Sequence, residues 1–413
     1  MVAAPGAKAL KLASHFGGIA YPRHANALVL HLTIGPDLIC FGVDRDDLSL
    51  REIHRLTLAA PVQYVWPHPS RNLLYVASSN RSISKAGNQH MLATVEVDDH
   101  TGAMRQLSQV SLPTRPIHLT LDPAARWALV VYNAPALISA HAIDSAGRAG
   151  ETIVQSPVPR VGHFPHQVLM LPSGEAAVIV ARGNHAVPGR PEEPGSFEFL
   201  SVGQGKLSNL STVAPGGGFG FGPRHLEFHP NGRWAAVSVE RQNELHIFAV
   251  ERDQFSRKPA FRLSTLETPP TRGHDQLSST IHFHPNGKSL YVVNRHDTAV
   301  YGDGSKPSDY AGNNIAVYAF DEESGKPELL QHVLTESIHV RSFSFDASGR
   351  LLVTASILPA LARRNGKVER IPSRLSFFHV GEDGRLTLAK VRDMDNEQMM
   401  FWSRLNGSLT TVL

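Results

Sequence analysis

One strand–turn–strand pattern recurs six times along this chain of 413 residues and constrains its fold more than any other feature. Each copy has an apolar strand, a turn with Pro or Asp and a Gly or polar residue, and a second apolar strand. The copies lie 54, 49, 58, 55 and 62 residues apart, measured between the equivalent turn positions Pro69, Pro123, Pro172, Pro230, Pro285 and Ala347. Repeats of this length are typical of four-stranded blades, in which the pattern supplies the two inner strands.

The repeat predicts an all-β fold, a seven-bladed β-propeller of four-stranded antiparallel blades. Six copies account for the middle of the chain, while the head offers three strand-like stretches and the tail offers one. We expect head and tail to share a seventh blade, because this closes the ring and removes exposed sheet edges. Residues 1–27 are then an N-terminal extension and residues 28–413 a single propeller domain. A stack of separate β domains is the alternative.

The charge balance argues against nucleic acid or an anionic membrane as a partner. The chain has 40 Lys+Arg and 37 Asp+Glu, and the basic residues are scattered singly. No stretch of about 18 apolar residues predicts a membrane span. Cys40 is the only cysteine, which indicates a reducing compartment. We therefore expect a soluble cytoplasmic protein, a monomer or weak homo-oligomer, with a cleaved bacterial leader as the alternative.

Charged residues gather at one register of the repeat. Counting eight residues either way from the turn residue Gly232 reaches Arg224 and Glu240, so an antiparallel hairpin should bring this pair together. The same count in the other copies gives the pairs His166 with Arg182, Ser279 with Arg295, Arg341 with Ile357, Gln63 with Ser79 and Ile117 with Asn133. Because the first strand of each blade lines the central channel, we expect one site at one channel mouth.

Long segments rich in Gly and Pro are expected on the face of the propeller that carries the charged register, which is independent support for a site there. They span residues 183–197, 296–314 and 357–374, and each follows the second strand of a repeat. Loops held over a rigid scaffold often carry function, so these segments could roof a pocket above the charged register.

Other motifs favour structural roles. A single charge at a strand end is more often solvated than functional, so the prediction depends on the shared register. His282 and His284 alternate on one strand face, but without a carboxylate in register we interpret them as packed or turn-bonded rather than metal ligands. PGGGFGFG, residues 215–222, precedes a strand rather than a helix and is interpreted as a connection, not a phosphate loop. We expect no cofactor and no metal.

The runs HFPHQ, GPRHLEFHPNGRWAAVSVE and HFHPNGKSLYVVNR resemble the seven-bladed propeller lactonase family. That family includes the propeller-type 6-phosphogluconolactonase and the 3-carboxy-cis,cis-muconate lactonizing enzyme, and the likeness covers roughly residues 28–405. The resemblance implies a functional set of His166, Arg224, Glu240 and Arg295. Val239 stands where members of the family usually have Asn, and the chain is longer than typical members.

The expected function is hydrolysis of a small anionic lactone, from sugar-acid or aromatic catabolism, without a metal. Arginines would hold a carboxylate or phosphate and stabilise charge on the carbonyl oxygen, with Arg182, His225, Arg341 and Asn133 as further substrate-binding residues. Glu240 or His166 would be the general base. A lactone-forming cycloisomerase acting on a carboxymuconate-like diene and a non-catalytic binding propeller remain alternatives.

Overall fold

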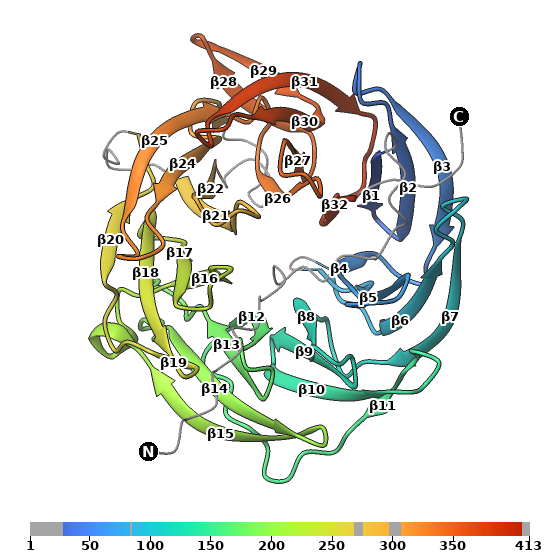
Figure 1. Ribbon diagram of the computed structural model, residues 1–413, viewed down its shortest axis with the longest axis vertical. Coiled ribbons are helices and arrows are strands. Elements are labelled where there is room, and N and C mark those ends of the chain that lie inside the picture. The colour runs from blue at the N-terminus through green and yellow to red at the C-terminus, as the bar shows by residue number, and fades with distance from the viewer. Residues whose placement is uncertain (1–27, 83–84, 268–275, 297–306, 407–413) are drawn as a thin grey trace, which may run out of the picture.

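Seven β-sheets surround a central channel and form a closed propeller (Figure 1). The computed structural model describes residues 28–82, 85–267, 276–296 and 307–406. Innermost in the blades are β4 (Val62–Pro67), β8 (His118–Leu121), β12 (Pro165–Met170), β16 (Pro223–Phe228), β21 (Gln276–Phe283), β26 (Val340–Phe345) and β32 (Ser403–Asn406). The predicted all-β, seven-bladed fold is confirmed.

The remaining strands complete each blade outward from the channel. Second strands are β5 (Leu73–Ser79), β9 (Trp127–Asn133), β13 (Ala176–Ala181), β17 (Trp234–Val239), β22 (Ser289–His296), β27 (Leu351–Ser356) and β1 (Leu28–Ile34). Third strands are β6 (His90–Val97), β10 (Ala136–Ile143), β14 (Ser196–Gly203), β18 (Glu244–Glu251), β24 (Asn314–Phe320), β30 (Ser373–Val380) and β2 (Asp37–Val43). Outer strands are β7 (Met104–Ser111), β11 (Ala149–Thr152), β15 (Lys206–Val213), β20 (Phe261–Ser264), β25 (Pro327–Leu334), β31 (Leu386–Met394) and β3 (Leu50–Thr57), and the short β19 (Gln254–Phe255) also pairs with β18.

The two ends of the described chain meet in one blade, as the sequence predicts. β1 pairs antiparallel with β32 from Val29 opposite Asn406 to Leu32 opposite Ser403. In Figure 1 the red β32 lies beside the blue β1, on the channel side of that blade. The assignment of residues 1–27 as an extension lies outside the described residues.

Apolar side chains pack between neighbouring blades and form the core. One buried cluster joins Val178 and Phe197 of the blade that begins with β12 to Val237 and Phe248 of the next blade. The strands behind it are buried on both faces, which explains their almost continuous Ala and Val runs. The rigid ring holds the strand ends, and hence the site residues, in fixed positions.

The turns between first and second strands connect consecutive blades. Gly287 has a φ of +77°, and a Cβ there would lie 2.6 Å from Nε2 of His229 in the preceding blade. Nε2 of His229 lies 2.9 Å from the carbonyl oxygen of Gly287, while its Nδ1 accepts the backbone N–H of Asn231. The imidazole therefore caps its own turn and contacts the next one, and only glycine fits so close to it.

A small extra sheet lies outside the ring and was not predicted. β23 (Ser308–Asp309) pairs parallel with β28 (Ala360–Arg364), which pairs with β29 (Lys367–Ile371). Two of the three long segments thus meet each other, although residues 297–306 lie outside the described residues. The 3-10 helix η1 (Pro215–Gly218) connects β15 to β16, as expected for the glycine-rich run. No helix in the described ranges is long and apolar enough to cross a membrane.

Candidate functional site

Glu240 lies at the centre of a cluster of three arginines from three blades. Nη1 of Arg182 donates to Oε2 of Glu240 over 2.9 Å, and Nη2 of Arg295 donates to Oε1 over 2.6 Å. Nε of Arg224 forms an ion pair with Oε1 at 3.0 Å. The structure therefore brings together four of the residues that the sequence singled out, and we call them the arginine cluster.

A β-bulge, rather than the simple register expected from the sequence, places Arg224. Pro223 pairs with Val239 and His225 pairs with Ser238, so Arg224 is the extra residue of β16 and Glu240 follows β17. Arg224 and Glu240 are therefore not direct strand partners, but they lie together as the count from Gly232 predicts. Register shifts recur at the start of four other inner strands, where they involve Gln63, His166, Ser279 with Thr280, and Arg341. Bulges of this kind redirect side chains and are common beside active sites.

Three of the four residues of the arginine cluster are buried. The side chains of Arg224, Arg295 and Glu240 are 2%, 4% and 1% exposed, whereas that of Arg182 is 15% exposed. Burial alone raises the pKa of the Glu240 carboxyl, but Arg182, Arg295 and Arg224 outweigh it and hold the pKa well below its usual range. Glu240 is therefore a carboxylate at any working pH and a weak base.

Three buried or half-buried histidines next to the cluster are neutral. Burial, together with Arg224, lowers the pKa of His166 and of His225 well below 6.5. Their rings lie 5.2 Å apart, and Nδ1 of His166 has no hydrogen-bond partner in the described part of the chain. Burial and Arg295 likewise lower the pKa of His339, whose Nε2 lies 2.5 Å from Nη1 of Arg295. Neutral imidazoles can accept a proton.

The structure adds His339 to the site and leaves Asn133 out of it. His339 precedes β26 and stands two residues before Arg341, so its proximity to a predicted site residue was the available signal. Arg341 is half-buried and its charge acts on Arg224, which places it near the cluster.

Asn133 ends β9 and pairs with Ala136 across the next turn; among described residues no hydrogen bond or ion pair joins its side chain to the cluster. β8 pairs with β9 in the same register relative to its turn as β16 pairs with β17, but this pairing has no register shift, so no bulge redirects a side chain there.

The two histidines of IHFHP have different partners. Nδ1 of His284 accepts the backbone N–H of Asn286 and its Nε2 lies 2.9 Å from the Gly349 carbonyl, which confirms a turn-bonded role. Nδ1 of His282 lies 3.0 Å from Oε2 of Glu227 in the preceding blade, so the expectation that no carboxylate stands near it is wrong. Among the described residues no group of three or more His, Cys, Asp or Glu could hold a metal ion.

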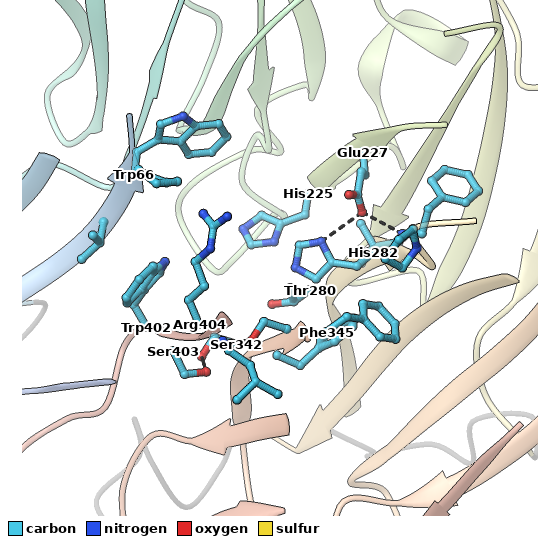
Figure 2. A pocket seen from close by; sticks show the side chains of 18 of the residues that line it. Trp66, His225, Glu227, Thr280, His282, Ser342, Phe345, Trp402, Ser403 and Arg404 are labelled. Atoms are coloured by element: carbon cyan, nitrogen blue, oxygen red, sulfur yellow. Dashed lines mark hydrogen bonds and ion pairs between the residues drawn. The ribbon is translucent and has the colours of Figure 1, made fainter. Parts of the chain in front are cut away.

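A cavity of about 390 Å³ occupies the channel between the inner strands. His225 and Arg341 line it near the arginine cluster, and Pro230 and Pro285 line it at the turn end. Figure 2 shows Trp66, Trp402 and Arg404 on one side of this space and the His282 and Glu227 pair on the other. None of the four cluster residues lines the cavity, but His225 does, and its Nδ1 lies 3.3 Å from Nη1 of Arg224.

A family model identifies the family, curated relatives carry a related name, and solved structures share the fold. A family model described as Lactonase, 7-bladed beta-propeller, matches residues 33–357. A 6-phosphogluconolactonase of Bacillus subtilis is 24% identical over 81% of this chain and 90% of its own length. A 6-phosphogluconolactonase of Pectobacterium atrosepticum is 25% identical over 62% of this chain and 68% of its own length. The periplasmic gluconolactonase of Pseudomonas aeruginosa shares the fold at a TM-score of 0.69, with 18% identity over 92% of this chain and 98% of its own.

Proposed function

The chain belongs to the seven-bladed β-propeller lactonase family, and on that premise we propose that it hydrolyses a small anionic lactone derived from a sugar acid. The observation that carries this proposal is the charge of the site. Within the described part of the chain, four guanidinium groups, those of the arginine cluster and Arg341, stand against the carboxylate of Glu240, and the nearby histidines are neutral. A buried excess of positive charge favours an anionic ligand, and guanidinium groups match carboxylate and phosphate oxygens.

In this proposal the half-exposed groups contact the substrate. Arg341 and His225 line the cavity, and Arg182, at 15% exposed, is the least buried member of the arginine cluster. A guanidinium would donate to the lactone carbonyl oxygen as negative charge develops there during attack by water. Glu240 acts as a positioning residue, because its two oxygens fix three guanidinium groups relative to one another.

We assign the general base to His166 rather than to Glu240. The depressed pKa of Glu240 makes its carboxylate a poor proton acceptor, whereas His166 is a neutral imidazole with a ring nitrogen that has no partner within the described structure. His166 would take a proton from water as the water oxygen bonds to the carbonyl carbon. It would return the proton to the ring oxygen when the ester bond breaks, which yields the hydroxy acid.

The alternatives have less support. Neither curated relative described above is named as a cycloisomerase, and both are named for a phosphorylated sugar lactone. A sugar-acid lactone is therefore preferred over a product of aromatic catabolism. Independence from metal ions, and a cytoplasmic location, stay predictions.

The experiment compares two lactones that differ only in a phosphate, 6-phosphogluconolactone and gluconolactone, at rates above the spontaneous reaction. We expect the phosphorylated lactone to be preferred and Arg341→Gln to raise its KM about tenfold. His166→Asn should lower kcat by about 100-fold or more, while the exposed neighbour His163→Asn should leave it unchanged.

Because burial lowers the pKa of His166, wild-type kcat/KM should persist below pH 6.5 and fall at lower pH. Turnover of neither lactone would refute the function; wild-type kcat in His166→Asn would refute the assigned base.

A further inference from the structure

The hairpin formed by β28 and β29 is a feature that lactone hydrolysis in the channel does not explain. It projects from the ring at the periphery of the molecule (Figure 1), and among the described strands β29 pairs with β28 alone. Its two-residue turn consists of Asn365 and Gly366, whose φ values are 50° and 76°. A turn of this kind fixes the register of the two strands, so the hairpin presents one defined, unpaired edge.

The side chains of the hairpin divide into a packed face and a free face. Three residues of the packed face are buried in a small cluster with Tyr310, and these are Ala360, Ala362 and Ile371. The free face consists of two apolar residues and two arginines, all exposed, namely Leu361, Arg363, Val368 and Arg370. The apolar pair is 39% and 50% exposed. In the part of the chain that the structure describes, the side chains of Arg363 and Arg370 form no hydrogen bond or ion pair.

The edge of β29 differs from the outer edges of the blades. In six blades the outer strand pairs with the third strand through a register shift, and in the seventh the outer position is divided between β19 and β20. Bulges of this kind protect a sheet edge against pairing with another chain. β28 and β29 pair from Ala360 opposite Ile371 to Arg364 opposite Lys367 without a shift. The edge of β29 therefore lacks the protection that the blades have.

The backbone of this edge has hydrogen-bonding groups that point outward at two residues. The turn makes Arg364 and Lys367 a hydrogen-bonded pair, and such pairs alternate along an antiparallel hairpin with pairs that share no bond. Val368 and Arg370 belong to the pairs without a bond to β28. Their N–H and C=O groups are thus directed toward the position of a further strand, while their side chains lie on the free face.

The charge of the free face selects the strand that fits there. Pairing with β29 of a second copy would double the arginines of this face and add no carboxylate to it, and like charges at neighbouring positions destabilise a sheet. A strand with carboxylate side chains would instead pair with Arg363 and Arg370. Charges that only prevented pairing would not need the exposed apolar surface of Leu361 and Val368 between them.

We propose that the edge of β29 is a docking site for an extended acidic segment of another protein, which adds a strand beside β29. Residues two apart lie on the same face of a strand, so the segment carries an apolar residue opposite Val368 and Asp or Glu opposite Arg370. Main-chain hydrogen bonds give affinity in this mode of recognition, and the side chains give specificity. The proposal goes beyond lactone hydrolysis and uses no residue of the arginine cluster or the channel cavity.

The test measures binding of a fluorescein-labelled peptide to the full-length protein by fluorescence anisotropy. The peptide is Thr-Val-Thr-Glu-Thr-Val-Thr-Glu-Thr, in which valine and glutamate alternate on one face. We expect it to bind about tenfold or more tightly than the version with lysine in place of glutamate, and N-methylation of its backbone to abolish binding. Arg370→Gln should weaken binding about threefold or more. Arg392→Gln, an equally exposed position on the bulged outer strand β31, should bind like the wild type.

A second variant tests the backbone of the edge separately from its charge. Val368→Pro removes an outward N–H group and leaves the hydrogen bonds between β28 and β29 in place, so it should fold and lose binding. Circular dichroism and urea unfolding check the fold of each variant. No binding at millimolar peptide, equal binding of the glutamate and lysine peptides, or full binding by Val368→Pro would each overturn the proposal. Binding to phosphatidylserine vesicles without binding to the peptide would overturn it in favour of a membrane surface. All of these outcomes are independent of whether any lactone is hydrolysed.

Discussion

The two ends of the inner strands use polar residues in opposite ways. At the turn end, His229 and His284 occupy equivalent positions in consecutive blades, and each caps its own turn and contacts the carbonyl of the next blade's glycine. At the opposite end, the bulged positions carry different residues from blade to blade, including His166, Arg224 and Arg341. Their side chains converge on one shared carboxylate or on one another.

The contrast shows how a repeat separates structure from chemistry. A residue that the repeat preserves has the same local task in every blade, and it stabilises the ring. Residues that differ at one register of the repeat cannot share a local task, so their convergence needs another explanation. A site on the channel axis supplies it, because that axis is the one place where all seven inner strands are close.

The largest expected effect is at the cluster end. Glu240→Gln leaves three buried guanidinium groups without their carboxylate, which should destabilise the fold by about 3–5 kcal/mol and lower kcat/KM by about 100-fold or more. Chemical denaturation and lactone turnover measure the two effects. Glu244→Gln, in the same blade with a 27% exposed carboxylate, should cost less than about 1 kcal/mol. Equal losses of stability in Glu240→Gln and Glu244→Gln would show that the burial of Glu240 among the arginines makes no difference.

Substitutions at the turn end should change folding stability and leave lactone turnover unchanged. Gly287→Ala puts a Cβ 2.6 Å from Nε2 of His229 in a backbone conformation with positive φ, and we expect a loss of about 2–3 kcal/mol. Gly366→Ala is the matched control, because its φ is +76° and no heavy atom lies within 4 Å of the added carbon. The control should lose about 1–2 kcal/mol from backbone strain. If Gly287→Ala and Gly366→Ala lose the same folding stability, the close contact between Gly287 and His229 does not add to the cost of the substitution.

The smallest expected effect is the part of the pH dependence of folding stability that His118 contributes. Burial, assisted by Arg224, lowers the pKa of His118 to about 3. The unfolded imidazole gains a proton below about pH 6.5 and the folded one does not, so stability from this group is full above pH 6.5 and falls as the pH drops toward 3. Lowering the pH from 6.5 to 5 should cost about 2 kcal/mol.

Urea unfolding of the wild type and of His118→Leu at both pH values measures this contribution. The variant should lose less stability on acidification by that amount, and the exposed His100→Asn should behave as the wild type. An unchanged acid sensitivity in His118→Leu would mean that His118 does not carry it.

Much of the fold could be predicted from the sequence because the repeat is a local pattern. Alternating apolar strands around turns such as HPNG determine the hairpins, and the unequal head and tail require a shared blade. Simple counting from Gly232 also brought Arg224 and Glu240 together, although it missed the bulge that places Arg224. The same count also singled out Asn133, whose blade has the same register but no bulge, and whose side chain does not bond to the cluster.

The sequence by itself determined the ring, its closure and the end of the strands at which charges gather. Only the tertiary structure decided that Glu240 is buried beneath three arginines, that His339 joins Arg295, and that Arg404 shares a cavity with Trp66. The physical reason is that strand periodicity is set by neighbours along the chain. Burial, pKa and convergence at the channel depend on side chains contributed by blades far apart in sequence.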